Sequence, residues 1–243
     1  MNTIPRCPYT RPASTHALTH LPVAVTFDLD DTLYPQSSWL EGAWQDVAQT
    51  AQSAFDVPAE VGFPRLMAVS AEGSARGGII DTAFPELDPD QLTALVSAFH
   101  QYRASELEPY VGAVAILRGL RSRGVSTALI TDGAPAGQHN KIDALGIRSL
   151  FDVITISDEH GRAYRKPHEL PFLETARALD IPPARILHIG DRWDKDVKGA
   201  ENAGYLGCLR VHTGEYGHVP CQADGKGTRC VRDLAGAAAL LFT

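Results

Sequence analysis

The sequence lacks any apolar run of the roughly 18 residues needed to cross a bilayer. Its longest candidate, residues 234–242, is short and rich in alanine, and we expect a terminal helix that packs on the core. Residues 1–20 contain no apolar segment typical of a secretory signal, so we predict a flexible extension there. The same residues contain no acidic side chain, which leaves an organelle transit peptide open.

A basic surplus is also missing, because the 243 residues carry a formal net charge of −7 and a sequence pI of about 5.7. Nucleic-acid-binding domains usually show a basic surplus or stripe, so neither nucleic acid nor membrane is an expected partner. We predict a soluble cytoplasmic protein. An anionic ligand would have to be attracted locally, by a metal ion or a few cations, since the overall field repels it.

Cysteine is scarce as well, with only Cys7, Cys208, Cys221 and Cys230. Their spacing contains no compact CxxC knuckle of the kind that binds zinc. Two histidines lie near Cys221 and Cys230, but we expect reduced thiols there in preference to structural zinc or a disulfide.

Short, β-branched apolar runs recur along the chain, beginning with residues 21–29 (LPVAVTFDL). Such runs are typical of strands buried on both faces of a parallel sheet. Strands that alternate with helices predict an α/β fold, a doubly wound, Rossmann-like parallel sheet. Further strands are expected at 125–131, 152–156, 185–189, 205–211 and 229–231, and helices at 111–123, 135–145, 168–179, 194–203 and from 233.

The segment between the first two strands is different, because residues 36–108 carry helix patterns and no convincing strand. About seventy helical residues are too many for a simple crossover, so we predict an inserted α-helical cap at 36–108. The core would then comprise residues 21–35 and 109–243. Ligands bind outside the carboxyl ends of the strands in open α/β sheets, so this cap should overhang the site. Its helices are expected at 38–55, 58–71 and 89–105.

Acidic residues crowd the end of the first predicted strand, where Asp28, Asp30 and Asp31 follow Phe27 within four positions. Strand side chains alternate, so Asp28 and Asp30 should share one side. Carboxylates buried at the end of an apolar strand are unfavourable unless they are paired or bound to metal. The simpler interpretation, an acidic turn that caps a helix, is disfavoured by the segments downstream.

The second predicted strand ends in Thr131, Asp132 and Gly133, which alone would indicate an ordinary turn. Farther on, Lys166 precedes Pro167 at the start of a predicted helix. Proline suits the first helical position and keeps its predecessor extended, so we expect the lysine to project from the loop.

The fourth predicted strand runs into residues 190–196 (GDRWDKD), which brings Asp191 and Asp196 to the same sheet edge. Taken in order, these four strand-end segments resemble the motifs of the haloacid dehalogenase-superfamily hydrolases that carry a helical cap between their first two motifs. The matching motifs are DxDxT, the Thr before Gly, Lys-Pro and GDxxxxD. The resemblance spans about residues 21–241.

This resemblance implies a phosphatase that hydrolyses a small phosphorylated metabolite through an aspartyl-phosphate intermediate. Asp28 would be the nucleophile, and Asp30 would protonate the leaving oxygen and later deprotonate the attacking water. Thr131 would donate a hydrogen bond to a phosphoryl oxygen. Lys166 would balance the charge of the nucleophile and of the transferred group.

The resemblance also implies Mg²⁺ as cofactor, bound by Asp28, the backbone carbonyl of Asp30 and Asp191, with Asp196 in support. Charge favours a cation independently, because the carboxylates of Asp28, Asp30, Asp191 and Asp196 would face a single basic side chain, that of Lys166. Neighbouring carboxylates raise one another's pKa, so Asp28 could not stay an anionic nucleophile among them. Hard oxygen ligands favour Mg²⁺ over zinc.

Two positions depart from the commonest family pattern: Asp132 stands where many relatives carry asparagine, and Asp31 replaces the commonest glycine. Candidate substrate contacts are Arg76, in the glycine-flanked segment EGSARGG, together with Arg165 and Gly133. Candidate substrates include phosphoglycolate, sugar phosphates, nucleoside monophosphates and pyrophosphate.

Three alternatives remain within or beside this interpretation. A dehalogenase releases halide, which needs no proton, so Asp30 would be superfluous and phosphate esters are favoured. A phosphomutase would need the same acid and base, together with a bisphosphate activator. A non-catalytic binding protein should have lost at least one of Asp28, Asp30, Lys166 or Asp191, and none is lost.

Overall fold

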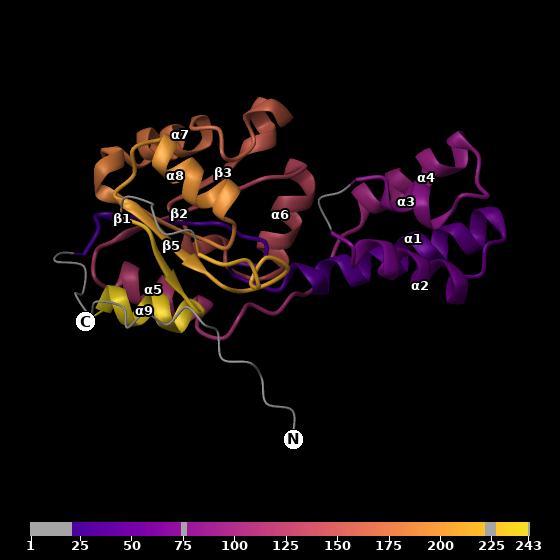
Figure 1. Cartoon of the computed structure of the whole chain (residues 1–243), viewed down its shortest axis with the longest axis horizontal. Helices are drawn as coiled ribbons and strands as arrows, with labels where there is room; N and C mark the ends of the chain where they lie inside the picture. Colours follow the sequence, from indigo (N-terminus) through magenta and orange to yellow (C-terminus); the bar gives the residue numbers. More distant parts are fainter. Residues whose placement is uncertain (1–20, 74–76, 222–226, 243) are drawn as a thin grey trace, which may run out of the picture.

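A six-stranded parallel sheet forms the centre of the computed structural model, which describes residues 21–73, 77–221 and 227–242 (Figure 1). The strand order is β3-β2-β1-β4-β5-β6, so the chain starts in the middle and winds outwards in both directions. The predicted doubly wound α/β fold is therefore confirmed. The strands are β1 (Ala24–Phe27), β2 (Ser126–Thr131), β3 (Val153–Ile156), β4 (Ile186–Gly190), β5 (Gly207–Val211) and β6 (Arg229–Val231).

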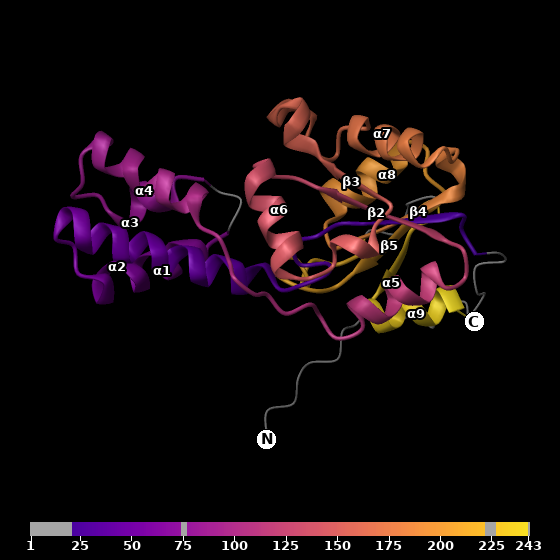
Figure 2. The ribbon, with the colours of Figure 1, turned by 180° about the vertical axis from the view of Figure 1, so that it is seen from behind.

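Helices cover both faces of this sheet (Figure 2). One face carries α5 (Ala113–Arg121), α6 (Pro135–Ala144) and α9 (Leu234–Phe242), and the other carries α7 (Leu170–Leu179) and α8 (Lys198–Asn202). Side chains alternate along β1, so Val25 and Phe27 pack with the first group and Ala24 with the second. Short 3₁₀ turns lie at Arg148–Leu150, Ser157–His160, Arg162–Tyr164 and Pro183–Arg185. Within the described ranges, no helix is both long and apolar enough to cross a membrane.

Four helices between β1 and β2 pack around an apolar cluster of their own, to one side of the sheet (Figure 1). Its largest fully buried members are Leu66, Phe84 and Leu95. Helix α4 begins with a capping box, in which Asp88 accepts the backbone N–H groups of Asp90 and Gln91. The four helices are α1 (Gln36–Phe55), α2 (Ala59–Ser70), α3 (Ile79–Ala83), which was not predicted, and α4 (Pro89–Gln101).

The helix predicted at 194–203 is wrong over its first part, because residues Trp193–Val197 form a π-helical turn before α8 begins. In this wide turn the backbone N–H groups of Asp196 and Val197 both donate to the Arg192 carbonyl, at 2.8 and 3.3 Å. The Asp196 side chain in turn accepts the Arg192 N–H at 2.9 Å. The turn therefore lays the Asp196 carboxylate directly against Gly190 at the end of β4.

Cys221 and Cys230 form a disulfide, so the prediction of reduced thiols at these positions is wrong. Strand β6 pairs with β5 and sets Cys230 opposite Arg210, beside the loop that leaves β5 and carries Cys221. This proximity arises from strand pairing, which the cysteine spacing does not reveal. Cys208 remains a free, buried thiol.

We expect Leu117→Ala to lower the free energy of unfolding by about 2–5 kcal/mol, because Leu117 on α5 is fully buried and alanine would leave a cavity. Val111→Ala is the control, since Val111 is 97% exposed and should shift stability by less than about 0.5 kcal/mol. Urea unfolding monitored by circular dichroism measures both. Equal stabilities for the two variants would contradict the packing described.

Candidate active site

A cavity of about 480 Å³ lies beyond the carboxyl ends of β1, β2 and β4. Acidic and basic side chains meet in its wall. These groups come from separate chain segments because parallel strands bring their carboxyl ends to one edge of the sheet. All six residues predicted to be catalytic or to bind the metal line it together: Asp28, Asp30, Thr131, Lys166, Asp191 and Asp196.

The end of β1 places the first carboxylates. Asp28 keeps the register of the sheet, since its backbone N–H donates to the Ile189 carbonyl at 2.9 Å. Three residues later the chain turns at Asp31, whose φ of 58° lies in the left-handed region. The Asp31 carboxylate accepts the backbone N–H of Gln36 at 2.9 Å and that of Glu215 at 3.0 Å. Asp31 thus ties the turn to α1 and to the loop after β5.

Lys166 lines the cavity, and its side chain is 3% exposed. It donates to the carboxylate of Asp28, to that of Asp196 at 2.6 Å and to the Ile130 carbonyl at 3.3 Å. Burial lowers the pKa of Lys166, but the charges of Asp196 and Asp28 outweigh it and hold the pKa well above its usual value. Lys166 is therefore a permanent cation beside Asp28.

Asp132, the departure from the commoner asparagine, contacts the backbone that carries Lys166. Its Oδ1 accepts the Lys166 N–H at 3.0 Å and the Ser157 hydroxyl at 2.7 Å. Its Oδ2 accepts the Lys195 ammonium at 2.9 Å. The extra acid is thus paired with a cation and holds the Lys166 loop in place.

Asp28, Asp191 and Asp196 each offer an oxygen, and these oxygens lie within 4.8 Å of one another. Burial and the Asp196 charge, only partly offset by Lys166, raise the pKa of Asp28 to about 7. Burial and the charges of Asp196 and Asp28 raise the pKa of Asp191 to about 9. The basic side chains that the structure describes therefore do not neutralise the charge of these three carboxylates. A hard divalent cation such as Mg²⁺ fits these oxygen donors.

His188 supports Asp196 from inside the sheet, and it was not predicted as part of the site. Its Nε2 lies 3.3 Å from Asp196 Oδ1, and its Nδ1 lies 2.8 Å from the Thr26 hydroxyl. Burial raises the pKa of Asp196, but Lys166 and His188 outweigh it and hold the pKa well below its usual value. A histidine inside an otherwise apolar strand was the available signal.

Asp30 faces a different set of partners. Its Oδ1 accepts the Tyr34 hydroxyl at 2.5 Å and the Lys141 ammonium at 2.8 Å. Its Oδ2 accepts the same ammonium and the Gln138 amide, both at 3.1 Å. Burial raises the pKa of Asp30, but Lys141, Tyr34 and Gln138 outweigh it and lower the pKa below its usual value.

The sequence analysis missed Gln138 and Lys141, although α6 carries a signal for them. They occupy one helix face with Ile142 and Leu145, at the i, i+3, i+4, i+7 spacing that is typical of a buried stripe. Both polar residues are buried. Polar residues on a buried helix face require partners, and here the partner is Asp30.

The remaining predicted residues have mixed surroundings. Thr131 lines the cavity and accepts the Gln138 amide at 2.5 Å. Gly133, with a φ of 134°, lies against the Gln138 side chain and lines a neighbouring cavity that shares Asp30 and Arg165 with the first. Arg165 lines the cavity but donates two hydrogen bonds to Asp158, at 2.5 and 2.6 Å. Arg76 lies outside the described residues.

Arg210 on β5 fixes the loop that follows this strand, from a fully buried position. Its Nε donates to the Asp191 carbonyl at 2.7 Å. Its other nitrogens donate to the carbonyls of Tyr216, Val219 and Pro220, at 2.9, 2.9 and 3.2 Å. One guanidinium thus joins the end of β4 to the loop that borders the cavity.

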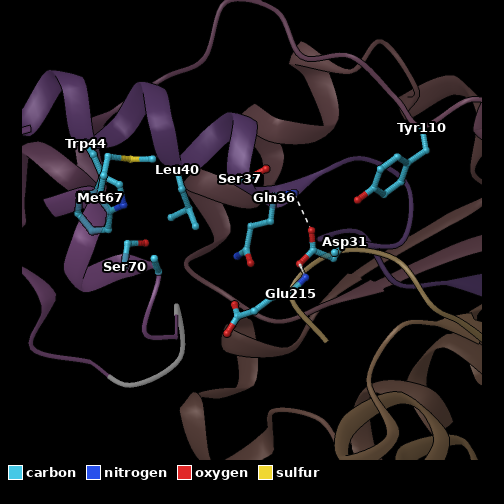
Figure 3. Close-up of a pocket in the computed structure, with 11 residues that line it drawn as sticks. Asp31, Gln36, Ser37, Leu40, Trp44, Met67, Ser70, Tyr110 and Glu215 are labelled. Atoms are coloured by element: carbon cyan, nitrogen blue, oxygen red, sulfur yellow. Dashed lines mark hydrogen bonds between the residues drawn. The ribbon is translucent and has the colours of Figure 1, made fainter. Parts of the chain in front are cut away.

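A second cavity, of about 380 Å³, adjoins the first and shares Asp31 and Gln36 with it (Figure 3). Figure 3 shows apolar side chains on one side and the carboxylates of Asp31 and Glu215 on the other. No basic side chain lines it among the residues that the structure describes. The other lining residues labelled in Figure 3 are Ser37, Leu40, Trp44, Met67, Ser70 and Tyr110.

A doubly wound parallel sheet with an aspartate–lysine cluster at its carboxyl edge is the arrangement of the haloacid dehalogenase-like hydrolases. The sequence profile of the haloacid dehalogenase-like hydrolases matches residues 23–204, and the chain belongs to this family. It is 33% identical over 201 residues to the glyceraldehyde 3-phosphate phosphatase of Methanopyrus kandleri, covering 79% of this chain and 85% of that protein. It is 30% identical over 189 residues to the phosphoglycolate phosphatase of Xylella fastidiosa, covering 75% and 77%. The chain is a hydrolase of the phosphatase type.

Solved structures share the fold at lower sequence identity. CbbY from Rhodobacter sphaeroides, in complex with phosphate, superimposes with a TM-score of 0.64 at 21% identity, over 90% of this chain and 99% of that one. A phosphatase of the same family from Thermococcus onnurineus gives a TM-score of 0.62 at 20% identity, over 90% and 97%.

We expect Mg²⁺ to raise the melting temperature more at about pH 8 than at about pH 6. The folded-state pKa values of Asp28 and Asp191 lie above their ordinary unfolded values, so the metal-free folded protein holds extra protons. Its free energy of unfolding therefore falls, through these two groups, as pH rises from about 4 to 9. Mg²⁺ replaces the protons, and the difference between the two pH values should be about 3 °C or more.

Differential scanning calorimetry with and without about 10 mM Mg²⁺ measures this difference. Asp191→Asn is the matched control, because it removes one ligand and, of the three clustered carboxylates, the one whose pKa is raised furthest, and its response to Mg²⁺ should be smaller. An identical Mg²⁺ response at both pH values would contradict a cation site at these carboxylates.

Proposed function

We propose that the protein is a Mg²⁺-dependent phosphatase that hydrolyses a small phosphorylated metabolite through an aspartyl-phosphate on Asp28. The observation that carries this proposal is the position of Asp28. Its carboxylate contacts the Lys166 ammonium and lies within 4.8 Å of ligand oxygens from Asp191 and Asp196. A carboxylate with these neighbours has a cation beside it and a site for a second one.

In the first displacement, an Asp28 oxygen attacks phosphorus and forms a new O–P bond while the ester P–O bond breaks. Asp30, whose pKa is lowered in the substrate-free protein, would bind a proton together with the substrate and give it to the departing oxygen, so an alcohol leaves in place of an alkoxide. In the second displacement, water attacks the phosphorus of the aspartyl-phosphate and Asp30 takes a proton from that water. Inorganic phosphate leaves, and Asp28 is restored as a carboxylate.

Lys166 and Thr131 serve the phosphoryl group in this proposal. Lys166 stabilises the charge that spreads over the phosphoryl oxygens as the bonds change. Thr131, at the end of β2, donates a hydrogen bond from its hydroxyl group to one of these oxygens, since its own oxygen already accepts a hydrogen bond from the Gln138 amide. Both side chains are at least 95% buried, so neither has to be stripped of water when substrate binds.

Asp28, Asp191 and Asp196 would hold the metal, which would neutralise the carboxylates and orient the phosphate. The raised pKa values of Asp28 and Asp191 support this assignment, because they indicate charge that the protein's own cations leave uncompensated. The net charge of −7 supports it as well, since an anionic substrate needs a local cation.

The organic part of the substrate would occupy the cavity of Figure 3 and carry no negative charge. Its described walls combine apolar and hydroxyl groups with the carboxylates of Asp31 and Glu215, and a substrate carboxylate would be repelled there. An aldehyde or hydroxyl group would be accepted. The M. kandleri relative, a glyceraldehyde 3-phosphate phosphatase, agrees with this chemistry better than the phosphoglycolate phosphatase does.

Asp28→Asn should lower phosphate release by at least about 1,000-fold, because the amide cannot form the acyl phosphate. EDTA should abolish the wild-type activity, and added Mg²⁺ should restore it. The assay is release of phosphate from glyceraldehyde 3-phosphate and from p-nitrophenyl phosphate. Asp90→Asn, on the exposed first turn of α4, is the control and should behave as wild type. Full activity in Asp28→Asn would exclude the proposed nucleophile.

Wild type should hydrolyse glyceraldehyde 3-phosphate with about 10-fold higher kcat/KM than 3-phosphoglycerate. The two substrates differ only in that 3-phosphoglycerate carries a carboxylate in place of the aldehyde. Met67→Lys would add a cation to the cavity wall and should narrow this ratio by about fivefold. Val61→Lys is the matched control, since Val61 lies on the same helix, is similarly exposed and does not line the cavity. A ratio that both variants leave unchanged would show that the organic group binds elsewhere.

A further inference from the structure

The Lys141 side chain joins three parts of the molecule that are far apart in sequence. It extends from α6, and its ammonium contacts both oxygens of Asp30, at 2.8 and 3.1 Å. The same ammonium lies 4.5 Å from the centre of the Trp39 ring, on α1. The side chain is 6% exposed, so water competes little for either contact. A cation held between a carboxylate and an aromatic face has a fixed position.

The hydrogen bonds to Asp30 are unequal, and this inequality distinguishes its two oxygens. Oδ1 accepts the two shorter bonds, from Tyr34 at 2.5 Å and from Lys141 at 2.8 Å. Oδ2 accepts two longer bonds, from Gln138 and Lys141, both at 3.1 Å. Oδ1 is therefore the more closely held oxygen, and Oδ2, with the two longer bonds, is the better placed of the two to exchange a proton with a leaving group or with water.

Helix α6 also links Asp30 to the predicted phosphate-binding hydroxyl. Gln138 donates to Asp30 Oδ2 and to the Thr131 hydroxyl oxygen, at 3.1 and 2.5 Å. Lys141 lies on the same face of the helix, one turn further along. The helix thus sets the distance between the side chain that would exchange the proton and the one that would hold the phosphoryl group.

Trp39 connects helices α1 and α4 to the contacts between Lys141 and Asp30. Its ring packs edge-on against Phe99 and Tyr102, with centroids 5.4 and 5.6 Å away. These contacts fix the ring at the start of α1, so the Lys141 ammonium is confined from the side of α1 and α4 as well as by Asp30. The position of Asp30 therefore depends on how these helices pack.

We propose that Lys141 is a positioning residue for Asp30: it anchors Oδ1 between α6 and Trp39 so that Oδ2 points at the leaving-group oxygen. The inference rests on the proposed phosphatase function. Lys141 itself touches no reacting atom in this proposal. It acts through Asp30, and its contribution should appear only where proton transfer to the leaving group limits the rate.

The experiment compares two substrates with different leaving groups, glycerol 3-phosphate and acetyl phosphate, in Lys141→Met. Glycerol must be protonated as it leaves, whereas acetate needs no proton. We expect the single-turnover rate of leaving-group release, which precedes the attack of water, to fall about 30-fold for glycerol 3-phosphate and no more than about threefold for acetyl phosphate. Lys141→Arg, which keeps the charge and the donors, should recover most of the loss.

Two further variants separate positioning from a structural role. Lys198→Met removes an exposed lysine on α8 and controls for the loss of one positive charge. In an Asp30→Asn background, adding Lys141→Met should lower glycerol 3-phosphate turnover by no more than about twofold, since the group through which Lys141 acts is already lost. Trp39→Leu should show the Lys141→Met pattern with a smaller loss, and Trp39→Phe should largely retain activity.

Equal losses on the two substrates would overturn the proposal, and so would additive losses in the double variant. Lys141→Arg tests it equally well if Lys141→Met fails to fold, because arginine that restores neither folding nor the leaving-group pattern gives Lys141 a purely structural role. Wild-type protein with no phosphatase activity would refute the proposed function and this inference together. Active wild type with Lys141→Met indistinguishable from Lys198→Met would refute this inference alone.

Discussion

The Lys166 ammonium lies between the carboxylates of Asp28 and Asp196, and the rest of the site depends on this contact. Moving an ion from water into a protein interior costs several kcal/mol even after relaxation, and these three groups are almost completely buried. Loss of one partner would leave an uncompensated charge, typically a destabilisation of about 3–5 kcal/mol. The Lys166 backbone is held in turn by Asp132, so the second strand positions the cation that the first strand needs.

The carboxylates of Asp28 and Asp30 are two residues apart, yet their surroundings shift their pKa values in opposite directions. Asp28 lies among Asp191, Asp196 and a single lysine, and its pKa is raised to about 7. Asp30 turns towards α6, where Lys141, Tyr34 and Gln138 lower its pKa. These shifts belong to the metal-free protein and run opposite to the proposed roles: a bound cation would lower the pKa of the nucleophile Asp28, and Asp30 would take up its proton together with the substrate. The difference between the two environments comes from the turn at Asp31, which sends the chain from the sheet into α1.

Much of the fold follows from local sequence patterns. Apolar runs that alternate with helical stretches predict the parallel sheet, and parallel strands bring Asp28, Thr131 and the residues after Gly190 to one edge. The π-helical turn before α8 was not predictable, because it depends on how Asp196 packs against the end of β4. The disulfide escaped prediction for a similar reason, since it requires the pairing of β6 with β5.

The polar residues around Asp30 show where sequence reasoning reaches its limit. Gln138 and Lys141 have the spacing of a buried helix face, but the identity of their partner depends on how α6 docks on the sheet. His188 and Arg210 are polar residues within apolar strands, and their partners likewise lie in other segments. The roles of all these groups are tertiary properties, whereas the acids at strand ends are marked by position alone.

Arg210 has a consequence for how this enzyme can diversify. In the loop after β5 its guanidinium binds three backbone carbonyls, those of Tyr216, Val219 and Pro220. Every amino acid supplies such a carbonyl, so these hydrogen bonds do not depend on which side chains the loop carries at these positions. Glu215, in the cavity wall, belongs to that loop. New substrate preferences could therefore evolve there by single substitutions, without disturbing the scaffold that supports Asp191.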